Sequence, residues 1–183
     1  MDEPILTPLS PDDLDAHLTG EDDQLIRWYT GGPSTREATA DYLHHCMTQW
    51  KIHGPLRAFG IRVNGVLAGT LDLRFGADEV NIAYGLYPAW RGKGLATRSV
   101  LLACRYAFSE GALLLVIKVE PGNTASSAVA VRAGFAHTGT VVEDGTVFTR
   151  YVLARDGAAP GAAGWRRARS GPEAAGGAGQ AEP

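Results

Sequence analysis

Hydrophobic and polar residues alternate in the middle of the chain in a way that predicts paired strands. Residues 58–63 and 66–75 are rich in β-branched and other apolar residues, and they flank Asn64-Gly65. This dipeptide is the one most typical of a two-residue type I′ turn, in which both turn residues have a positive φ. We therefore predict an antiparallel hairpin here, followed by a further strand over residues 79–87 that ends before a proline.

Three other segments have the period of a helix. Residues 38–52 follow the sequence at 34–37, Ser-Thr-Arg-Glu, which we interpret as a capping box. Residues 94–109 are apolar around most of a helical circumference. Residues 123–133 precede Gly134, which stands where a left-handed residue commonly ends a helix. We predict a helix in each segment and a shorter one that starts near the Ser-Pro pair at position 10.

The rest of the chain divides into a final group of strands and a tail. Residues 113–119 are predicted to form a buried strand, and residues 135–140 and 147–153 two closing strands. Beyond residue 155 the composition becomes rich in Gly, Ala, Pro and Arg, which cannot bury enough apolar surface to offset the entropy of ordering. We expect one domain over residues 1–155 and a disordered tail over 156–183.

The composition mainly argues against several classes of protein. A chain of 183 residues has room for one compact domain, and its net charge of −3 provides no basic field for nucleic acid. Cys46 and Cys104 are isolated, which argues against a disulfide framework or a zinc site. The acidic start lacks the features of a secretory signal, and the longest apolar run is far shorter than the roughly 20 residues that cross a bilayer. We expect a cytoplasmic protein.

Residues 91–96, Arg-Gly-Lys-Gly-Leu-Ala, lie between a predicted strand and a predicted helix and suit a bound diphosphate. Unpaired backbone N–H groups and the positive end of the helix can face one anion there. Gly92 and Gly94 lack a Cβ and Ala96 carries only a methyl group, so an anion can approach the backbone closely. The alternative is a turn that only connects the strand to the helix.

Two other glycine-rich motifs fit this turn less well. A P-loop needs four residues between its first glycine and Gly-Lys-Ser/Thr, and a dinucleotide-binding fingerprint needs a third Gly or Ala where Thr97 stands. Neither spacing is present. The turn therefore does not favour an ATP site or a dinucleotide site.

The turn resembles the signature of the GNAT N-acetyltransferase superfamily, Arg/Gln-x-x-Gly-x-Gly/Ala, which Arg91, Gly94 and Ala96 match. A second stretch, Asn-x-x-Ser at residues 123–126 followed by Gly-Phe at 134–135, is similar to the ribosomal-protein N-terminal acetyltransferase-like subgroup. The two stretches together identify the chain as similar to this superfamily over most of its length.

The resemblance implies a fold and a cosubstrate. The fold is a single α/β (α+β) domain, with a mixed, mostly antiparallel sheet of about six to seven strands that is splayed in the middle and flanked by about four helices. Acetyl-CoA is the implied cosubstrate, and no metal is implied. Acetyl-CoA would lie in the split between the strand that ends at Tyr87 and the strand over residues 113–119.

By the same resemblance, contacts to acetyl-CoA are divided along the chain. The backbone of Gly85 and Leu86 would bind the pantetheine arm, and Asn123 would bind near the amide region of the cosubstrate. Asn123 also has a simpler interpretation as the N-cap of its helix, and the two roles are compatible. The diphosphate would be bound by Arg91, Gly92, Lys93, Gly94, Leu95 and Ala96.

Acetyl transfer to an amine needs a neutral amine, a stabilised oxyanion and a proton for the departing thiolate. Many members of the superfamily supply that proton from a Tyr where this chain has Ala130. In the subgroup the Ser of Asn-x-x-Ser takes the role, which implies Ser126 as catalytic acid. We expect Glu79, on the same strand face as Asn81, to act as the base, with Asp72 on the neighbouring strand as the alternative.

The acceptor pocket is implied, again by resemblance, to include residues 22–34, and the three acids at 21–23 either favour a cationic amine or cap a helix. We therefore expect an N-acetyltransferase for a primary amine of a small molecule or a protein N-terminus. We expect no nucleic-acid or membrane partner, and a homodimer is compatible with the sequence. The alternatives are a non-catalytic acyl-CoA-binding module, which the missing Tyr at position 130 favours, and a nucleotide-binding regulator.

Overall fold

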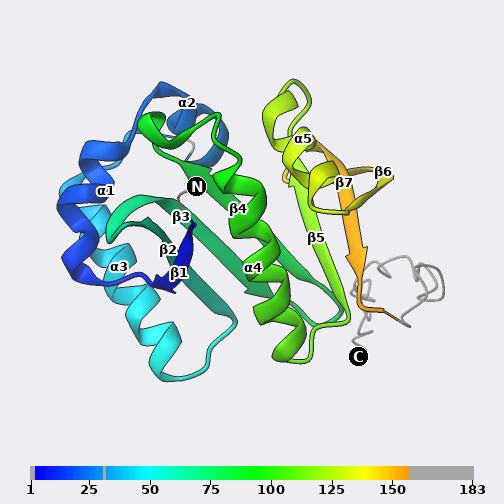
Figure 1. Cartoon of the computed structure of the whole chain (residues 1–183), viewed down its shortest axis with the longest axis horizontal. Helices are drawn as coiled ribbons and strands as arrows, with labels where there is room; N and C mark the ends of the chain where they lie inside the picture. The colour runs from blue at the N-terminus through cyan, green and yellow to red at the C-terminus, as the bar shows by residue number, and fades with distance from the viewer. Residues whose placement is uncertain (1–2, 31, 157–183) are drawn as a thin grey trace, which may run out of the picture.

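A computed structural model of the chain describes residues 3–30 and 32–156 and shows one central sheet with helices on both faces (Figure 1). The sheet has the strand order β1-β2-β3-β4-β5-β7-β6, and all neighbouring pairs are antiparallel except β4 and β5, which are parallel. This confirms the mixed, mostly antiparallel sheet. The strands are β1 (Ile5–Pro8), β2 (Leu56–Val63), β3 (Val66–Phe75), β4 (Val80–Leu86), β5 (Leu114–Val119), β6 (Ala136–Glu143) and β7 (Thr146–Ala154).

Five α-helices and three single-turn helices occupy the described residues. The prediction of about four helices did not include α2, which is only three residues long. The turn η2 is a π-helix, and η1 and η3 are 3-10 helices. The helices are η1 (Pro11–Asp13), α1 (Leu14–Gly20), α2 (Asp23–Leu25), η2 (Ile26–Thr30), α3 (Arg36–Lys51), η3 (Pro88–Trp90), α4 (Leu95–Ser109) and α5 (Thr124–Arg132).

The predicted hairpin is present between β2 and β3. Asn64 has a φ of 51° and Gly65 a φ of 82°, as a type I′ turn requires. The hairpin is extended on its other side by β1, which pairs antiparallel with β2. The short segment that forms β1 was not predicted as a strand, because four residues carry too little alternation to distinguish a strand from a loop.

The predicted capping box before α3 was wrong by one residue. Thr35 is the N-cap, and its side chain accepts a hydrogen bond from the backbone N–H of Ala38 at 3.2 Å. Ser34 instead donates from its backbone N–H and its hydroxyl to the Glu21 carboxylate, each at 3.0 Å. A charged acceptor from elsewhere in the chain therefore replaces the local partner that the spacing suggested.

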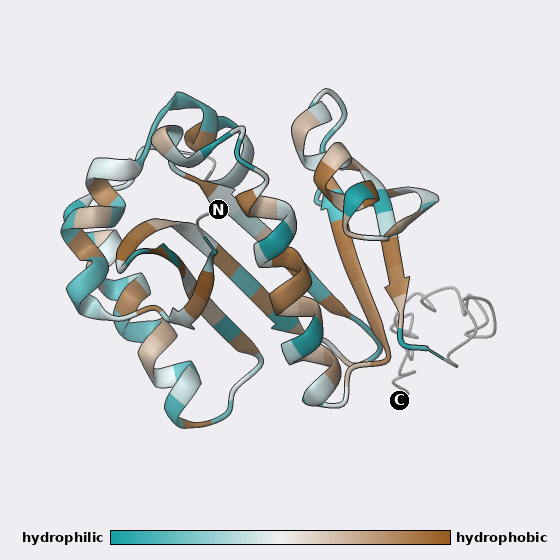
Figure 2. Ribbon diagram, viewed as in Figure 1, coloured by the Kyte–Doolittle hydropathy of each residue, from teal (hydrophilic) through white to brown (hydrophobic). Residues whose placement is uncertain are grey.

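The buried apolar residues form two clusters, and Figure 2 shows the hydrophobic stretches of β5 and α4 that contribute to the larger one. The larger cluster packs α4 against the sheet through Leu95, Val100 and Leu115, each no more than 1% exposed. Burying such a side chain contributes roughly 1.5–3 kcal/mol. Leu95 is also the first residue of α4, so this packing fixes the position of the turn that precedes the helix.

Both cysteines are free thiols inside these clusters. Burial raises the pKa of Cys46 to about 11 and that of Cys104 to about 12, so both thiols stay protonated at neutral pH. Over residues 3–30 and 32–156, no helix is long and apolar enough to cross a membrane. The same ranges contain no group of three His, Cys, Asp or Glu side chains that could hold a metal ion. The predicted tail lies, from residue 157 on, outside the described residues.

Candidate functional site

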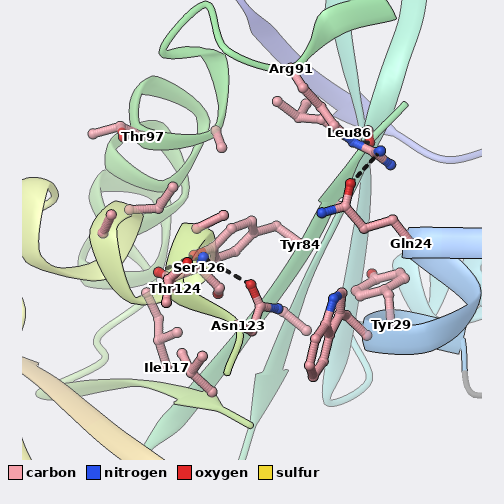
Figure 3. A pocket seen from close by; sticks show the side chains of 18 of the residues that line it. Gln24, Tyr29, Tyr84, Leu86, Arg91, Thr97, Ile117, Asn123, Thr124 and Ser126 are labelled. Carbon is pink, nitrogen blue, oxygen red and sulfur yellow. Dashed lines mark hydrogen bonds between the residues drawn. The ribbon is translucent and has the colours of Figure 1, made fainter. Parts of the chain in front are cut away.

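The site begins where two parallel strands separate. β4 and β5 pair only at Val80 with Leu115 and at Asn81 with Val116, although β4 continues to Leu86 and β5 to Val119. Beyond Asn81 the backbone groups of the two facing strand edges have no partner strand on that side. A cavity of about 770 Å³ opens in this gap (Figure 3), and the predicted splay of the sheet is thus present.

Three parts of the chain provide most of the cavity lining: the α2 and η2 segment, the end of β4 with the start of α4, and the end of β5 with the start of α5. Phe148 of β7 also lines the cavity. Pro88 ends β4 as predicted, and η3 carries the chain from there to the turn before α4. Lining residues from the three parts include Leu25, Trp28, Tyr29, Tyr84, Gly85, Leu86, Arg91, Gly92, Gly94, Leu95, Ala96, Lys118, Asn123 and Ser126.

Residues 91–96, called the diphosphate turn below, hold the backbone open toward this cavity. Gly92 has a φ of 74° and Gly94 a φ of 70°, and a Cβ added at Gly92 would meet no atom within 4 Å. The turn leads directly into α4, whose 15 residues place a positive helix end there. The Arg98 side chain closes the turn by donating to the Lys93 carbonyl oxygen at 3.2 Å. The arrangement can accept an anion against the backbone.

Two side chains of this turn do not extend freely into the cavity. Arg91 lines it, but its guanidinium donates to the Leu86 carbonyl and to the Asp22 carboxylate. Lys93 is not a lining residue, because its ammonium donates to the Ala89 carbonyl at 2.8 Å and lies over the Trp90 ring. Any contact from Lys93 to a ligand in the turn would therefore come from its backbone.

The start of α5 brings Asn123 and Ser126 to the opposite side of the cavity (Figure 3). Asn123 is the N-cap of α5, and its side-chain oxygen accepts from the Ser126 backbone N–H at 3.1 Å. Its amide nitrogen is not used in that bond. The cap role of Asn123 is therefore present, and its position on the cavity leaves the expected ligand contact available.

Tyr84 is a site residue that the sequence did not suggest. Its hydroxyl reaches from β4 across the gap and lies 3.0 Å from the Ser126 Oγ and 3.1 Å from the Ser126 carbonyl oxygen. Burial raises the pKa of Tyr84 to about 12, so the hydroxyl remains protonated at neutral pH. Tyr84 stands in an apolar strand beside Ile82 and Leu86, and a polar tip among such residues is the one signal that could have indicated it.

Glu79, expected as the base beside the reacting groups, lies outside the cavity lining. It precedes β4 at the end where β4 and β5 are still paired, and it is not among the lining residues. Its carboxylate accepts from Arg150 at 2.5 Å and lies 3.7 Å from the Lys118 ammonium. Strand alternation could not reveal these two cations, which come from β5 and β7.

Asp72, the alternative base, is 2% exposed on β3 and is also absent from the cavity lining. Tyr42 donates to both of its carboxylate oxygens at 3.0 Å, and Arg74 donates to one at 3.1 Å. Burial raises the pKa of Asp72, against the opposing effects of Arg74 and Tyr42. After burial, the charge of Asp72 also contributes to the raised pKa of Tyr29, which is a cavity-lining residue.

Residues 22–30, called the acceptor wall below, close one side of the cavity. Leu25, Trp28 and Tyr29 face the cavity from this wall. Asp22 is the N-cap of α2, accepting from the Leu25 backbone N–H at 3.1 Å. Of the two interpretations of the acids at 21–23, Asp22 fits the helix cap, and Glu21 is engaged by Ser34.

Comparison with protein families identifies a match over most of the chain. The profile of the family described as acetyltransferase (GNAT) domain matches residues 5–136. A comparison with proteins of curated function finds no significant match.

Solved structures with the same fold are numerous. A structure of AAC(6′)-Ib in complex with paromomycin and acetyl-CoA is 19% identical, covers 85% of this chain and 95% of its own, and has a TM-score of 0.74. RimL, a ribosomal L7/L12 α-N-protein acetyltransferase in complex with CoA, is 18% identical, with 84% and 95% covered and a TM-score of 0.74. The microcin C7 self-immunity acetyltransferase MccE, in complex with acetyl-CoA and AMP, is 17% identical, with 85% and 94% covered and a TM-score of 0.73.

Proposed function

The chain belongs to the acetyltransferase (GNAT) domain family, and from this premise we propose that it moves the acetyl group of acetyl-CoA directly to a primary amine. One observation carries the proposal. The diphosphate turn, the unpaired edge of β4 and the start of α5 all border one cavity, at the place where the sheet splays. Each of the three parts offers a different kind of contact to the same extended ligand.

The residues around the cavity fit acetyl-CoA part by part. Gly85 and Leu86 pair with β3 on one side and lie beyond the part of β4 that pairs with β5, and the backbone there suits the amide groups of a pantetheine arm. The backbone of residues 91–96 would bind the diphosphate at the start of α4. Asn123 would bind the amide region with the side-chain nitrogen that its cap bond leaves available.

The reaction then needs few side chains. Acetyl-CoA supplies an acetyl thioester. A bond forms between the amine nitrogen and the acetyl carbon, and the bond from that carbon to sulfur breaks, so that sulfur leaves with the electron pair. Ser126 would donate its hydroxyl proton to the sulfur, and the proton that the amine nitrogen releases as the amide forms would return through water to the Ser126 Oγ. The Tyr84 hydroxyl, which donates to the Ser126 carbonyl oxygen at 3.1 Å and lies 3.0 Å from the Ser126 Oγ, would hold the serine hydroxyl beside the sulfur.

We propose no carboxylate base for this reaction. Glu79 is engaged by Arg150 outside the cavity, and Asp72 is covered by Tyr42 and Arg74. The amine would lose its proton to water before it attacks. We therefore expect the rate to rise with pH up to the pKa of the acceptor amine, which initial rates between pH 6 and 10 would measure. A rate that levels off well below the amine pKa would instead indicate a base in the protein.

The acceptor is proposed as a primary amine of a small molecule or of a protein N-terminus. The neighbours AAC(6′)-Ib and RimL have names that point to these two classes, an aminoglycoside and a ribosomal protein. We also propose a cytoplasmic location, which the two free, buried thiols support, and no nucleic-acid partner, which the net charge of −3 supports. A homodimer is proposed on the edge strand β6, which exposes Val142.

The test combines binding and turnover. Isothermal titration of acetyl-CoA is expected to show binding, and release of CoA thiol is expected with at least one member of a panel of aminoglycosides, polyamines and N-terminal peptides. Binding without thiol release above hydrolysis would support the acyl-CoA-binding module instead. Equal affinity for ATP and acetyl-CoA would support the nucleotide-binding regulator, and no binding of either would exclude all three functions.

A further inference from the structure

We propose that the ion pair between Arg91 and Asp22 relays occupancy of the diphosphate turn to the acceptor wall, so that acetyl-CoA binding orders the surface that receives the amine. The proposal rests on the proposed function, since it takes acetyl-CoA to occupy the turn. It makes Arg91 and Asp22 positioning residues that connect the two substrate sites.

The Arg91 guanidinium holds three groups at once. Its Nη1 and Nη2 each donate to one oxygen of the Asp22 carboxylate at 2.7 Å, and its Nε donates to the Leu86 carbonyl oxygen at 2.9 Å. Nη1 also donates to the Gln24 side chain at 2.6 Å. Arg91 and Asp22 are partly buried, and a fork-shaped charged contact of this kind is stronger than a single exposed pair. Figure 3 shows Arg91 reaching from the turn toward Gln24.

Asp22 serves the acceptor wall and the turn with the same carboxylate. Besides accepting from Arg91, it caps α2 through the Leu25 backbone N–H. The Arg91 hydrogen bonds lower the pKa of Asp22, so the carboxylate stays charged throughout the physiological range. A shift or rotation of Arg91 would therefore act directly on the first residue of the wall.

The acceptor wall has little internal stability of its own. It consists of three residues of α-helix followed by a five-residue π-helix, η2. Isolated helices of such length are marginal, and π-helical turns are rare because their geometry is unfavourable. The order of this segment therefore depends on contacts made from outside it.

Those outside contacts span the cavity. Leu25 lies against β4, where a Cβ added at Gly85 would come within 2.5 Å of its side chain. Trp28 reaches the other side, where its ring lies 3.8 Å from the Cβ position of Gly122, just before α5. A wall that touches both sides of the split is suited to close around a cosubstrate between them.

Coupling between the diphosphate turn and the acceptor wall follows from Arg91, which belongs to the turn and binds Asp22 in the wall. An anion bound by the backbone N–H groups of the turn fixes the residues next to Arg91, which in turn favours the geometry that holds Asp22. By thermodynamic reciprocity, an ordered wall then raises the affinity of the turn for its anion. Coupled sites typically change each other's affinity by about 5- to 150-fold.

Hydrogen exchange of the full chain tests this relay without an acceptor. The probe is 3′-phospho-ADP, which has the diphosphate of acetyl-CoA but no pantetheine arm to touch the wall directly. In the wild type we expect slower exchange both at residues 92–98 and at residues 22–30. Asp22→Asn keeps the cap acceptor, and Arg91→Lys keeps the positive charge. In both variants we expect protection at residues 92–98 and its loss at residues 22–30, with acetyl-CoA affinity lowered by about 5-fold or more.

Arg36→Gln is the matched control, because it breaks an exposed Arg–Asp pair with Asp15 outside the cavity and should behave as wild type. The relay is excluded if the variants still protect residues 22–30, or if the wild type protects only the turn. It is also excluded if Asp22→Asn binds acetyl-CoA more tightly, which would mean that Asp22 only neutralises Arg91. If the wild type binds neither probe nor acetyl-CoA, the proposed function fails together with the relay. Exchange rates in β3 report whether each variant is folded.

Discussion

The diphosphate turn and the acceptor wall border the same cavity but are stabilised in different ways. The turn has its shape from local backbone conformation, with positive φ at Gly92 and Gly94. The wall is held by side chains that are distant in sequence, since Arg91 and Asp22 are 69 positions apart. A site defined by local backbone can be inherited intact, whereas a site defined by distant contacts changes whenever one partner changes.

The solved neighbours are consistent with this difference. Structures of AAC(6′)-Ib and MccE contain acetyl-CoA, and one of RimL contains CoA, whereas their names and titles refer to unlike second substrates. A fold shared at a TM-score of 0.74 therefore accommodates different acceptors. The following predictions test whether the turn and the wall of this chain can be changed separately.

The largest effect is expected from filling the turn. Gly94→Trp should lower acetyl-CoA affinity by more than about 100-fold, equivalent to about 2.7 kcal/mol, because the side chain would occupy the anion position and strain a residue with φ of 70°. Gly111→Trp is the control, since Gly111 also has a positive φ but lies outside the cavity. Titration calorimetry measures both. Equal losses in the two variants would mean that strain alone, and not the turn, lowers the affinity.

The next effect concerns the chemical step between the two regions. Ser126→Ala and Tyr84→Phe should each lower kcat by about 10- to 100-fold, at the low end of general acid catalysis because a thiolate leaves easily. The double variant should lose little more than Ser126→Ala, since the two hydroxyls act through one hydrogen bond. The KM for acetyl-CoA should stay within about twofold of wild type. A full kcat in Ser126→Ala would show that water protonates the sulfur unaided.

A smaller and one-sided effect is expected at the wall. In Gly85→Ala the added Cβ would come within 2.5 Å of Leu25, so the wall must move. Overpacking of this kind costs typically about 1–3 kcal/mol, and we expect it to raise the KM for the acceptor about fivefold or more. Acetyl-CoA affinity should fall less than the acceptor KM rises. If acetyl-CoA affinity falls more, Gly85 acts mainly on the cosubstrate arm.

The smallest effect is a dependence of the free energy of unfolding on pH, which we expect from His17 on α1. The Nδ1 of His17, on α1, lies 2.9 Å from the hydroxyl of Tyr87, and burial lowers the pKa of His17 below 6.5. Below pH 6.5 the unfolded chain binds the proton first, so the free energy of unfolding should decrease as pH falls from 7 through that window. Urea unfolding at several pH values measures this slope. His17→Gln should remove part of it, and an unchanged slope would assign the effect to other groups.

The sequence was sufficient for most elements because their signals are local. The type I′ hairpin followed from Asn64-Gly65, and the end of α5 from Gly134, which has a φ of 89°. The open backbone of residues 91–96 has an equally local origin, since Gly92 and Gly94 both have a positive φ. The capping box at residues 34–37 failed because Glu21, 13 positions away, competed for Ser34.

The site residues show the same difference between local signals and contacts that are distant in sequence. Ser126 and Asn123 could be placed at a helix start from four adjacent residues, and the structure brings both to the cavity. Glu79 could not be placed, because its partners Lys118 and Arg150 come from strands whose neighbours are set only when the sheet forms. Tyr84 was missed because its partner lies across the split, 42 positions later.

By itself, the sequence determined which segments form strands and helices and which glycine-containing turn precedes α4, because periodicity, caps and glycine conformations act over a few residues. Only the tertiary structure decided which side chains face the cavity and which partners they have there. The pairing of Arg91 with Asp22, the contact of Tyr84 with Ser126 and the withdrawal of Glu79 from the cavity all depend on chain segments that meet after folding. Such contacts depend on the order and divergence of β4, β5 and β7, which no local pattern specifies.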